Sequence, residues 1–287
     1  MQEPKIGLAL GGGGALGTAH VGVLRSLTAH SIPVSAIAGT SAGAIIGAFH
    51  AFGISDETTV THLSRISWRT VAHFSFSKFG LLSNEPLGAI LHNAFDDARI
   101  EDSHIPFAIT ATDIATGELV VFKSGPLIPA LLATSCIPGI FTPVTIDGRM
   151  LVDGGLMNNL PITVLPSLGA DVLIGVNVIP RFPDNPPTNW FDVVNRAYDI
   201  ATRERYGDTE HANVVIHPDM SAFSYSSLNH LPQMVAEGTR ATDEHIEHIR
   251  TEIIKCRAHH HATATKHEHL THHKPTFVDK VKKFFSL

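Results

Sequence analysis

Two glycine-containing stretches near the N-terminus, IGLALGGGGALG at residues 6–17 and VSAIAGTSAG at residues 34–43, decide the fold of this chain. In each stretch an apolar run with the length of a buried strand ends at glycine, and residues with helical spacing follow it. The pattern predicts helices over 18–29 and from about 43 to 52. Strand, loop, helix, strand and turn together have the length of one right-handed βαβ unit, so we expect both loops at the same edge of a sheet.

The rest of the chain continues this alternation of strands and helices. Asp147-Gly148 between the apolar runs at 144–146 and 150–152 predicts a hairpin, because both turn residues tolerate positive φ. We therefore expect an α/β protein with a mostly parallel central sheet covered on both faces. The other expected strands are 105–112, 119–122, 172–178 and 214–217, and the other expected helices are 127–133, one starting at Pro161, 191–210 and 232–255.

Composition narrows the class of protein. The 287 residues are 44% hydrophobic and carry a formal net charge of -6, with no basic cluster in the first 250 residues, which argues against a nucleic-acid partner. Cys136 and Cys256 are too few for a disulfide framework or a cysteine metal site. The N-terminus has no secretory h-region, and no stretch reaches the roughly 18 apolar residues of a spanning helix. We expect a cytoplasmic protein that meets a membrane only peripherally.

The stretch Gly39-Thr40-Ser41-Ala42-Gly43 matches the G-x-S-x-G nucleophile elbow. In such an elbow a strained turn between strand and helix lifts the serine hydroxyl above the sheet, and small neighbours prevent a clash. The expected strand precedes Ser41 and the expected helix follows it. Ser41 is therefore the candidate nucleophile of a serine acyl-ester hydrolase.

The first glycine loop contains Gly12-x-Gly14-x-x-Gly17, which is formally a dinucleotide-binding pattern. That function needs an acidic residue about 20 positions later to hold the ribose, and none occurs between Glu3 and Asp56. The βαβ connectivity offers another use. The amides of Gly12, Gly13 and Gly14 would face a carbonyl attacked by Ser41 and form an oxyanion hole.

A serine nucleophile needs a base, and the 19 histidines offer none in a distinctive context. Asp153 in Val152-Asp153-Gly154-Gly155 is more distinctive, because it ends a strand and precedes two glycines that permit close approach. From the residues alone, however, a turn-capping aspartate is the favoured interpretation.

The ordered set of motifs resembles the patatin-like phospholipase family, in the form of its single-domain bacterial and archaeal members. The matching blocks are Leu8 to Leu10, Gly12 to Gly17, Gly39 to Gly43 and Asp153 to Gly155, with Thr134 to Phe141 and Asn158 to Pro161 as further blocks. The resemblance implies a three-layer αβα sandwich and hydrolysis of lipid acyl esters by a Ser41–Asp153 dyad, without histidine, metal or cofactor. Many members have Arg or Lys where this chain has Leu16, so a preference for anionic headgroups is not implied.

We expect a catalytic domain over 1–256 and a separate tail over 257–287. Histidines crowd residues 259–273 without a spacing that fixes a metal geometry, so a disordered linker is favoured over weak Zn or Ni binding. In the segment 275–287, helical spacing places Phe277, Val281 and Phe284 on one side of an expected helix and three lysines on the opposite side. This basic amphipathic helix would lie on a membrane or dock onto a protein surface.

The aromatic residues Trp68, Phe74, Phe76 and Phe79 would form a lid or acyl groove, or else ordinary core. The leading hypothesis is an acyl hydrolase that binds its substrate near them. An acyltransferase using the same acyl-enzyme and a lipid-binding regulatory module are the alternatives. Dependence on an acceptor alcohol separates the first alternative, and lipid binding that is indifferent to Ser41 and Asp153 separates the second.

Overall fold

The strands form one large and one small sheet in the computed structural model, which describes residues 3–66, 73–74, 78–180, 186–188, 190–202, 209–226 and 228–272. β1 (Ile6–Leu10), β2 (Val34–Thr40), β5 (Phe107–Asp113), β10 (Val172–Val176) and β11 (Val214–Ile216) run parallel in the order β11-β10-β1-β2-β5. The antiparallel strands β9 (Arg149–Asp153) and β8 (Val144–Ile146) follow β5, and β6 (Leu119–Phe122) also pairs with β5. The small sheet joins β3 (His73–Phe74), β4 (Gly80–Ser83) and β7 (Gly139–Phe141).

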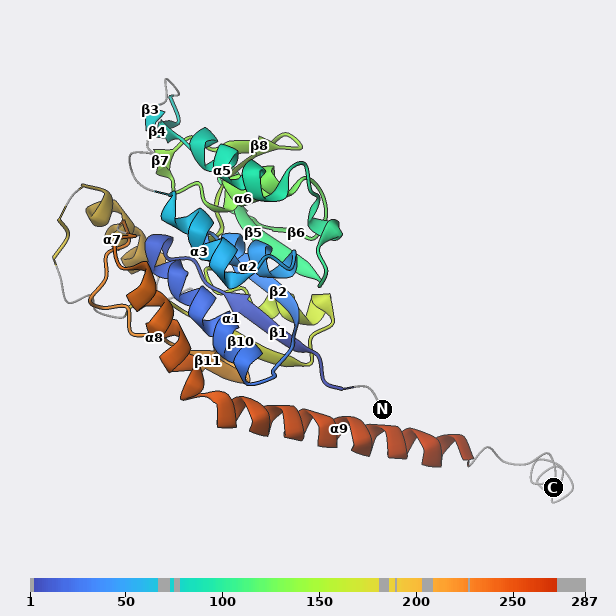
Figure 1. Cartoon of the computed structure of the whole chain (residues 1–287). Helices are drawn as coiled ribbons and strands as arrows, with labels where there is room; N and C mark the ends of the chain where they lie inside the picture. Colours follow the sequence, from blue (N-terminus) through green and yellow to red (C-terminus); the bar gives the residue numbers. More distant parts are fainter. Residues whose placement is uncertain are drawn as a thin grey trace, which may run out of the picture.

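One face of the large sheet carries most of the core. Helices α1 (Ala19–Ala29), α2 (Ala42–Ala51), α3 (Asp56–Ser64), α5 (Glu85–Phe95), α6 (Leu127–Thr134) and α8 (Leu231–Asp243) contribute to it. Figure 1 shows α1 and α8 side by side on this face. A Cβ on Gly22 of α1 would lie 1.9 Å from the carbonyl oxygen of Val235, and one on Gly238 of α8 would lie 2.0 Å from that of Ala19. The two helices therefore pack with their backbones in contact.

The opposite face is covered by the 3-10 helix η4 (Ile162–Leu168). It packs on Ala9, Ala38 and Ala108, which are small residues on three adjacent strands. The helix expected to start at Pro161 is therefore present, but as a short 3-10 helix with Pro166 inside it. With both faces covered, the predicted α/β fold with a mostly parallel central sheet is confirmed.

The predicted βαβ unit and hairpin are both present. β1 and β2 pair in parallel, and α1 connects them in the sequence. The short 3-10 helix η1 (Gly14–Thr18) lies between β1 and α1 along the chain. Asp147 and Gly148 have φ of 50° and 76° at the tip of the β8–β9 hairpin, as a two-residue turn requires.

The C-terminal helix α9 (Ile246–His272) corrects the expected linker. It runs through residue 256 and through the histidine-rich stretch without a break, and Figure 1 shows it leaving the body of the molecule. The composition suggested disorder, yet residues 246–272 contain neither Gly nor Pro, so nothing stops the helix from propagating. Its first turns pack onto the core through Ile246, Ile249 and Ile253.

Several expectations fall outside the described residues. These are the amphipathic helix over 275–287, the side chains of Trp68, Phe74 and Phe76, and the part of the helix predicted over 191–210 that covers 203–208. The described part of that helix is α7 (Trp190–Thr202). Within the described residues, no helix combines the length and hydropathy that crossing a bilayer requires.

Candidate active site

Ser41 occupies a strained turn between β2 and α2. Its φ of 51° and ψ of -125° lie outside the regions that L-residues favour. The turn is possible because positions 39 and 43 are glycine and carry no Cβ. A Cβ on Gly43 would lie 2.2 Å from the Leu10 carbonyl oxygen, and one on Gly39 would lie 2.5 Å from the Cα of Ala44. The Ser41 amide donates a 2.7 Å hydrogen bond to Oγ1 of Thr134, which holds the turn from the side of α6. The local geometry is that of the predicted elbow.

The glycine loop lies directly beside Ser41. A Cβ on Gly12 would lie 3.0 Å from the Cβ of Ser41, and one on Gly17 would lie 2.5 Å from the Cβ of Ala42, so the two loops meet only because both positions are glycine. The Gly12 amide donates to the carbonyl of Asn159 at 3.4 Å. The amides of Gly13 and Gly14 have no acceptor within the described residues and are free to bind a ligand oxygen.

His20 holds the start of the glycine loop through a hydrogen bond to the backbone. It is fully buried in α1, and its Nε2 lies 2.8 Å from the carbonyl oxygen of Gly11. Burial lowers the pKa of His20 to about 4, so the ring is neutral near pH 7 and Nε2 donates this hydrogen bond. Nδ1 has no partner within the described residues. His20 is therefore a structural support of the loop rather than a base for Ser41.

Strand register places Asp153 level with Ser41. Thr40 pairs with Thr110 across β2 and β5, so Ser41 stands level with Ala111, and Ala111 pairs with Asp153 across β5 and β9. β9 runs antiparallel to β5 and ends at Asp153, at the level of Ser41. The two backbones are about 10 Å apart, which is two strand spacings. The Ser41 side chain reaches far enough across this gap to lower the pKa of the Asp153 carboxyl group.

Asp153 is a buried carboxyl group with few partners. Its side chain accepts hydrogen bonds from the Gly155 amide at 2.8 Å and from the Tyr198 hydroxyl at 3.5 Å. Burial dominates over these hydrogen bonds and raises the pKa of Asp153 to about 6. The carboxylate is thus ionised at neutral pH and is a better proton acceptor than an ordinary aspartate.

The glycines after Asp153 make room for these contacts. A Cβ on Gly154 would lie 2.5 Å from the carbonyl oxygen of Thr110, and one on Gly155 would lie 2.8 Å from the Tyr198 hydroxyl. Leu16 of the glycine loop is fully buried in the main core. Its side chain is therefore packing material and not part of the site.

Three contributors to the site had no clear sequence signal of their role. Thr134 and Asn159 belong to the additional blocks of the resemblance, but nothing in their spacing showed that they contact the elbow and the glycine loop. Tyr198 comes from α7, a helix predicted without any link to Asp153. Asn159 is 4% exposed, and its Nδ2 has no partner within the described residues.

An apolar cavity of about 170 Å³ opens at Ser41. It is bounded by the first turns of α2 and by residues from α5, the α3 region and the chain near residue 226. Its larger apolar lining residues are Ile45, Ile46, Leu63, Ile66, Leu87, Ile137, Phe141 and Leu228. Phe79 of the aromatic cluster is half-exposed and does not line this cavity, so it belongs neither to the cavity wall nor to the core. The cavity forms instead where α2 leaves the elbow.

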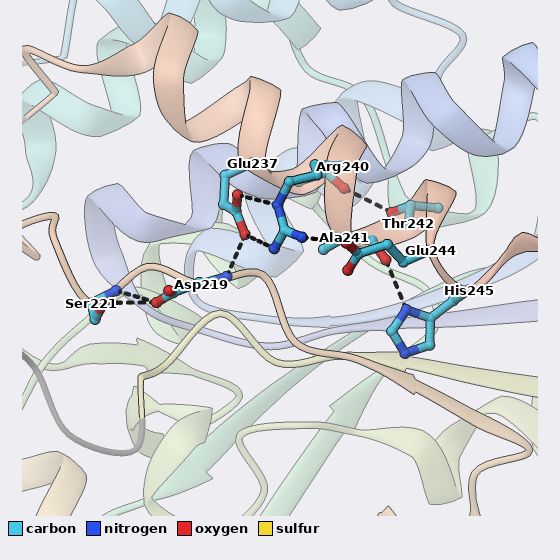
Figure 2. Close-up of polar contacts among 9 residues, drawn as sticks. Asp219, Ser221, Glu237, Arg240, Ala241, Thr242, Glu244 and His245 are labelled. Carbon is cyan, nitrogen blue, oxygen red and sulfur yellow. Dashed lines mark hydrogen bonds and ion pairs between the residues drawn. The ribbon is translucent and has the colours of Figure 1, made fainter.

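One wall of the cavity belongs to a segment fastened to α8. Glu237 of α8 accepts a 2.7 Å hydrogen bond from the Asp219 amide, and Arg240 donates two hydrogen bonds to the same carboxylate (Figure 2). Farther along this segment, the carbonyl of Tyr225 accepts a 2.9 Å hydrogen bond from the Ala15 amide, and Tyr225 lines the cavity. The contacts of Glu237 thus position the wall against the glycine loop.

Other candidate groups contribute no second reactive centre. Cys136 is buried, and burial raises the pKa of its thiol to about 12, so it is an inert thiol. In the part of the chain that the structure describes, no three His, Cys, Asp or Glu side chains come together in a way that would hold a metal ion.

A strained serine turn, a glycine loop beside it and a buried aspartate thus lie at one edge of the central sheet of this α/β protein. The family model described as patatin-like phospholipase matches residues 8–166, and the chain belongs to this family. The solved structure of VipD from Legionella pneumophila has the same fold, with a TM-score of 0.56 at 13% identity over 87% of this chain and 67% of that chain.

Two curated relatives illustrate the range of similarity. An NTE family protein of Mycobacterium tuberculosis is 37% identical over 181 residues, which are 62% of this chain and 50% of that protein. Lysophospholipase NTE1 of Mycosarcoma maydis is 31% identical over 204 residues, which are 67% of this chain and 11% of that protein. The chain thus spans half of the mycobacterial relative and about a tenth of the fungal one.

Proposed function

We propose that this chain hydrolyses acyl esters of lipids, with Ser41 as the nucleophile and Asp153 as the base. The observation that carries the proposal is that the strand register places a buried aspartate of raised pKa level with Ser41, where an apolar cavity opens. The similarity to the fungal lysophospholipase supports a lysophospholipid as substrate. The apolar cavity at Ser41 suits an acyl chain.

The first half of the reaction forms an acyl-enzyme. The Ser41 hydroxyl attacks the ester carbonyl carbon while Asp153 takes its proton, and the amides of Gly13 and Gly14 donate to the oxyanion. The Gly12 amide donates to the Asn159 carbonyl at 3.4 Å, so Gly13 and Gly14 are the two amides of this loop without a competing acceptor among the described residues. When the intermediate collapses, the alcohol leaves with the proton from Asp153.

The second half releases the fatty acid. A water molecule gives its proton to Asp153 and attacks the acyl-Ser41 carbonyl, and the same two amides hold the second oxyanion. The released Ser41 oxygen takes back the proton. Asp153 therefore acts as base and acid in turn, which a pKa of about 6 permits near neutral pH.

The test is release of fatty acid from lysophosphatidylcholine by wild type, Ser41→Ala and Asp153→Asn. Each variant should lose at least about a thousandfold in kcat, because the two groups act in every step. Ser167→Ala, on the opposite face of the sheet, is the matched serine control and should retain full activity. A Ser41→Ala protein with wild-type turnover would refute the mechanism. Product formation that requires an added acceptor alcohol would instead identify an acyltransferase.

A further inference from the structure

We propose that Ile46 sets the longest acyl chain that the cavity accepts; this inference rests on the proposed function. Ile46 lies five residues after Ser41 in α2, about 7.5 Å along the helix axis. Its side chain is 2% exposed and lines the cavity that opens at Ser41. An acyl chain that enters along α2 from the elbow therefore meets Ile46 within its first several carbons.

A second, smaller space also borders Ile46. It lies between α1, α2 and the start of α3, and it is too narrow to hold a water molecule. Its lining residues are Val21, Leu24, Ile46, His50, Ile54, Asp56 and Thr59. Ile46 is the one residue that lines both this void and the main cavity. Its side chain is thus a partition between two spaces.

Neighbouring residues do not share this position. Ile45 is adjacent in sequence, is also buried and lines the main cavity, but it does not border the second void. Leu63 and Leu87 line only the main cavity as well. A shortened Ile46 would extend the cavity lengthwise, whereas a shortened Ile45 would only widen it.

The chemistry of the second void limits the extension. Val21, Leu24 and Ile54 offer apolar contacts, but His50, Asp56 and Thr59 are polar, and Asp56 is paired with Arg25 at 3.4 Å. Ile46→Ala removes three carbon atoms, so the enlarged space has room for about three more methylenes. Each buried methylene corresponds to about a fourfold gain in kcat/KM. The preference for a chain three carbons longer should therefore rise by up to about 60-fold.

The experiment compares kcat/KM for p-nitrophenyl esters of 4 to 16 carbons in mixed micelles. We expect Ile46→Ala to move the optimum about three carbons longer and Ile46→Phe to move it shorter. Ile45→Ala should change rates without moving the optimum. Ile46→Val removes a single methyl group and should give a smaller shift in the same direction, which preserves the test if the alanine variant does not fold. An optimum that is unchanged in every Ile46 variant, or that moves equally in Ile45→Ala, overturns the inference.

A binding measurement separates this inference from the proposed function. Free fatty acids of the same lengths displace a fluorescent fatty acid from the cavity whether or not the protein turns over an ester. If the wild type shows no esterase activity but the longest fatty acid bound changes in the Ile46 variants, the hydrolase is refuted and the role of Ile46 is supported. Esterase activity with a length limit indifferent to Ile46 would do the reverse.

Discussion

Replacing Asp153 by Asn should abolish turnover and at the same time stabilise the fold at alkaline pH. Burial raises the pKa of Asp153 from its ordinary value of 3.8 to about 6, so the folded protein holds this proton more tightly than the unfolded chain. The contribution of Asp153 to stability is therefore fully present below pH 3.8 and is lost as the pH rises through 6. The loss amounts to about 3 kcal/mol at pH 8.

Asparagine has no charge to bury at any pH, and its side-chain oxygen can still accept from the Gly155 amide. Asp153→Asn should thus exceed wild type by about 3 kcal/mol at pH 8 and match it near pH 4. In thermal unfolding this gain is about 5–10 °C at pH 8. Urea denaturation at both pH values measures the same difference directly.

Asp113 provides a control with the opposite sign. It ends β5, next to β9, and its carboxylate accepts a 2.8 Å hydrogen bond from Nε of Arg149, which lowers the pKa of Asp113. Its contribution to stability is present at neutral pH and is lost as the pH falls, so Asp113→Asn should destabilise the protein at pH 8. If Asp153→Asn is no more stable than wild type at pH 8, or gains equally at pH 4 and pH 8, the burial argument is wrong.

Three further outcomes follow from the site. The kcat/KM of wild type should rise tenfold per pH unit up to about pH 6 and then level off, because Asp153 must be ionised to accept the Ser41 proton, and a flat profile between pH 5 and 7 would contradict this role. Gly43→Ala should lose more than about 3 kcal/mol in urea denaturation, or fail to fold, because its Cβ would lie 2.2 Å from the Leu10 carbonyl oxygen. Wild type should lose about 3 kcal/mol of stability through His20 as the pH falls from 6.5 to 4, because the unfolded chain takes up that proton first. His20→Gln can still donate to Gly11 and should lack this acid sensitivity, which comparing the two proteins at pH 7 and pH 4.5 would reveal.

Local chemistry explains why the sequence predicts so much of the site. The glycines at 12, 17, 39 and 43 lie in short strand-to-helix loops, where sequence order already places them next to Ser41. The Asp147-Gly148 turn is likewise defined by two residues. These features need no knowledge of distant contacts.

The position of Asp153 depends on information that no local pattern contains. Its level relative to Ser41 is set by two strand pairings, β2 with β5 and β5 with β9. The resemblance to a family supplied the dyad, whereas the residues alone favoured a turn-capping aspartate. The lining of the cavity was likewise beyond a local pattern, because its walls come from elements that are far apart in sequence.

The shared register of Ser41, Ala111 and Asp153 has a consequence for how such a site can change. Positions along a strand move in steps of about 3.3 Å, and each step turns the side chain to the opposite face of the sheet. A one-residue insertion within β5 or β9 would therefore dismantle the pairing at once, with no intermediate spacing available. Insertions in the Ile114–Glu118 turn or at the hairpin tip leave the register untouched. The strand register can change only by whole residues, so fine adjustment of the distance between Ser41 and Asp153 depends on the elbow torsions and the two side chains.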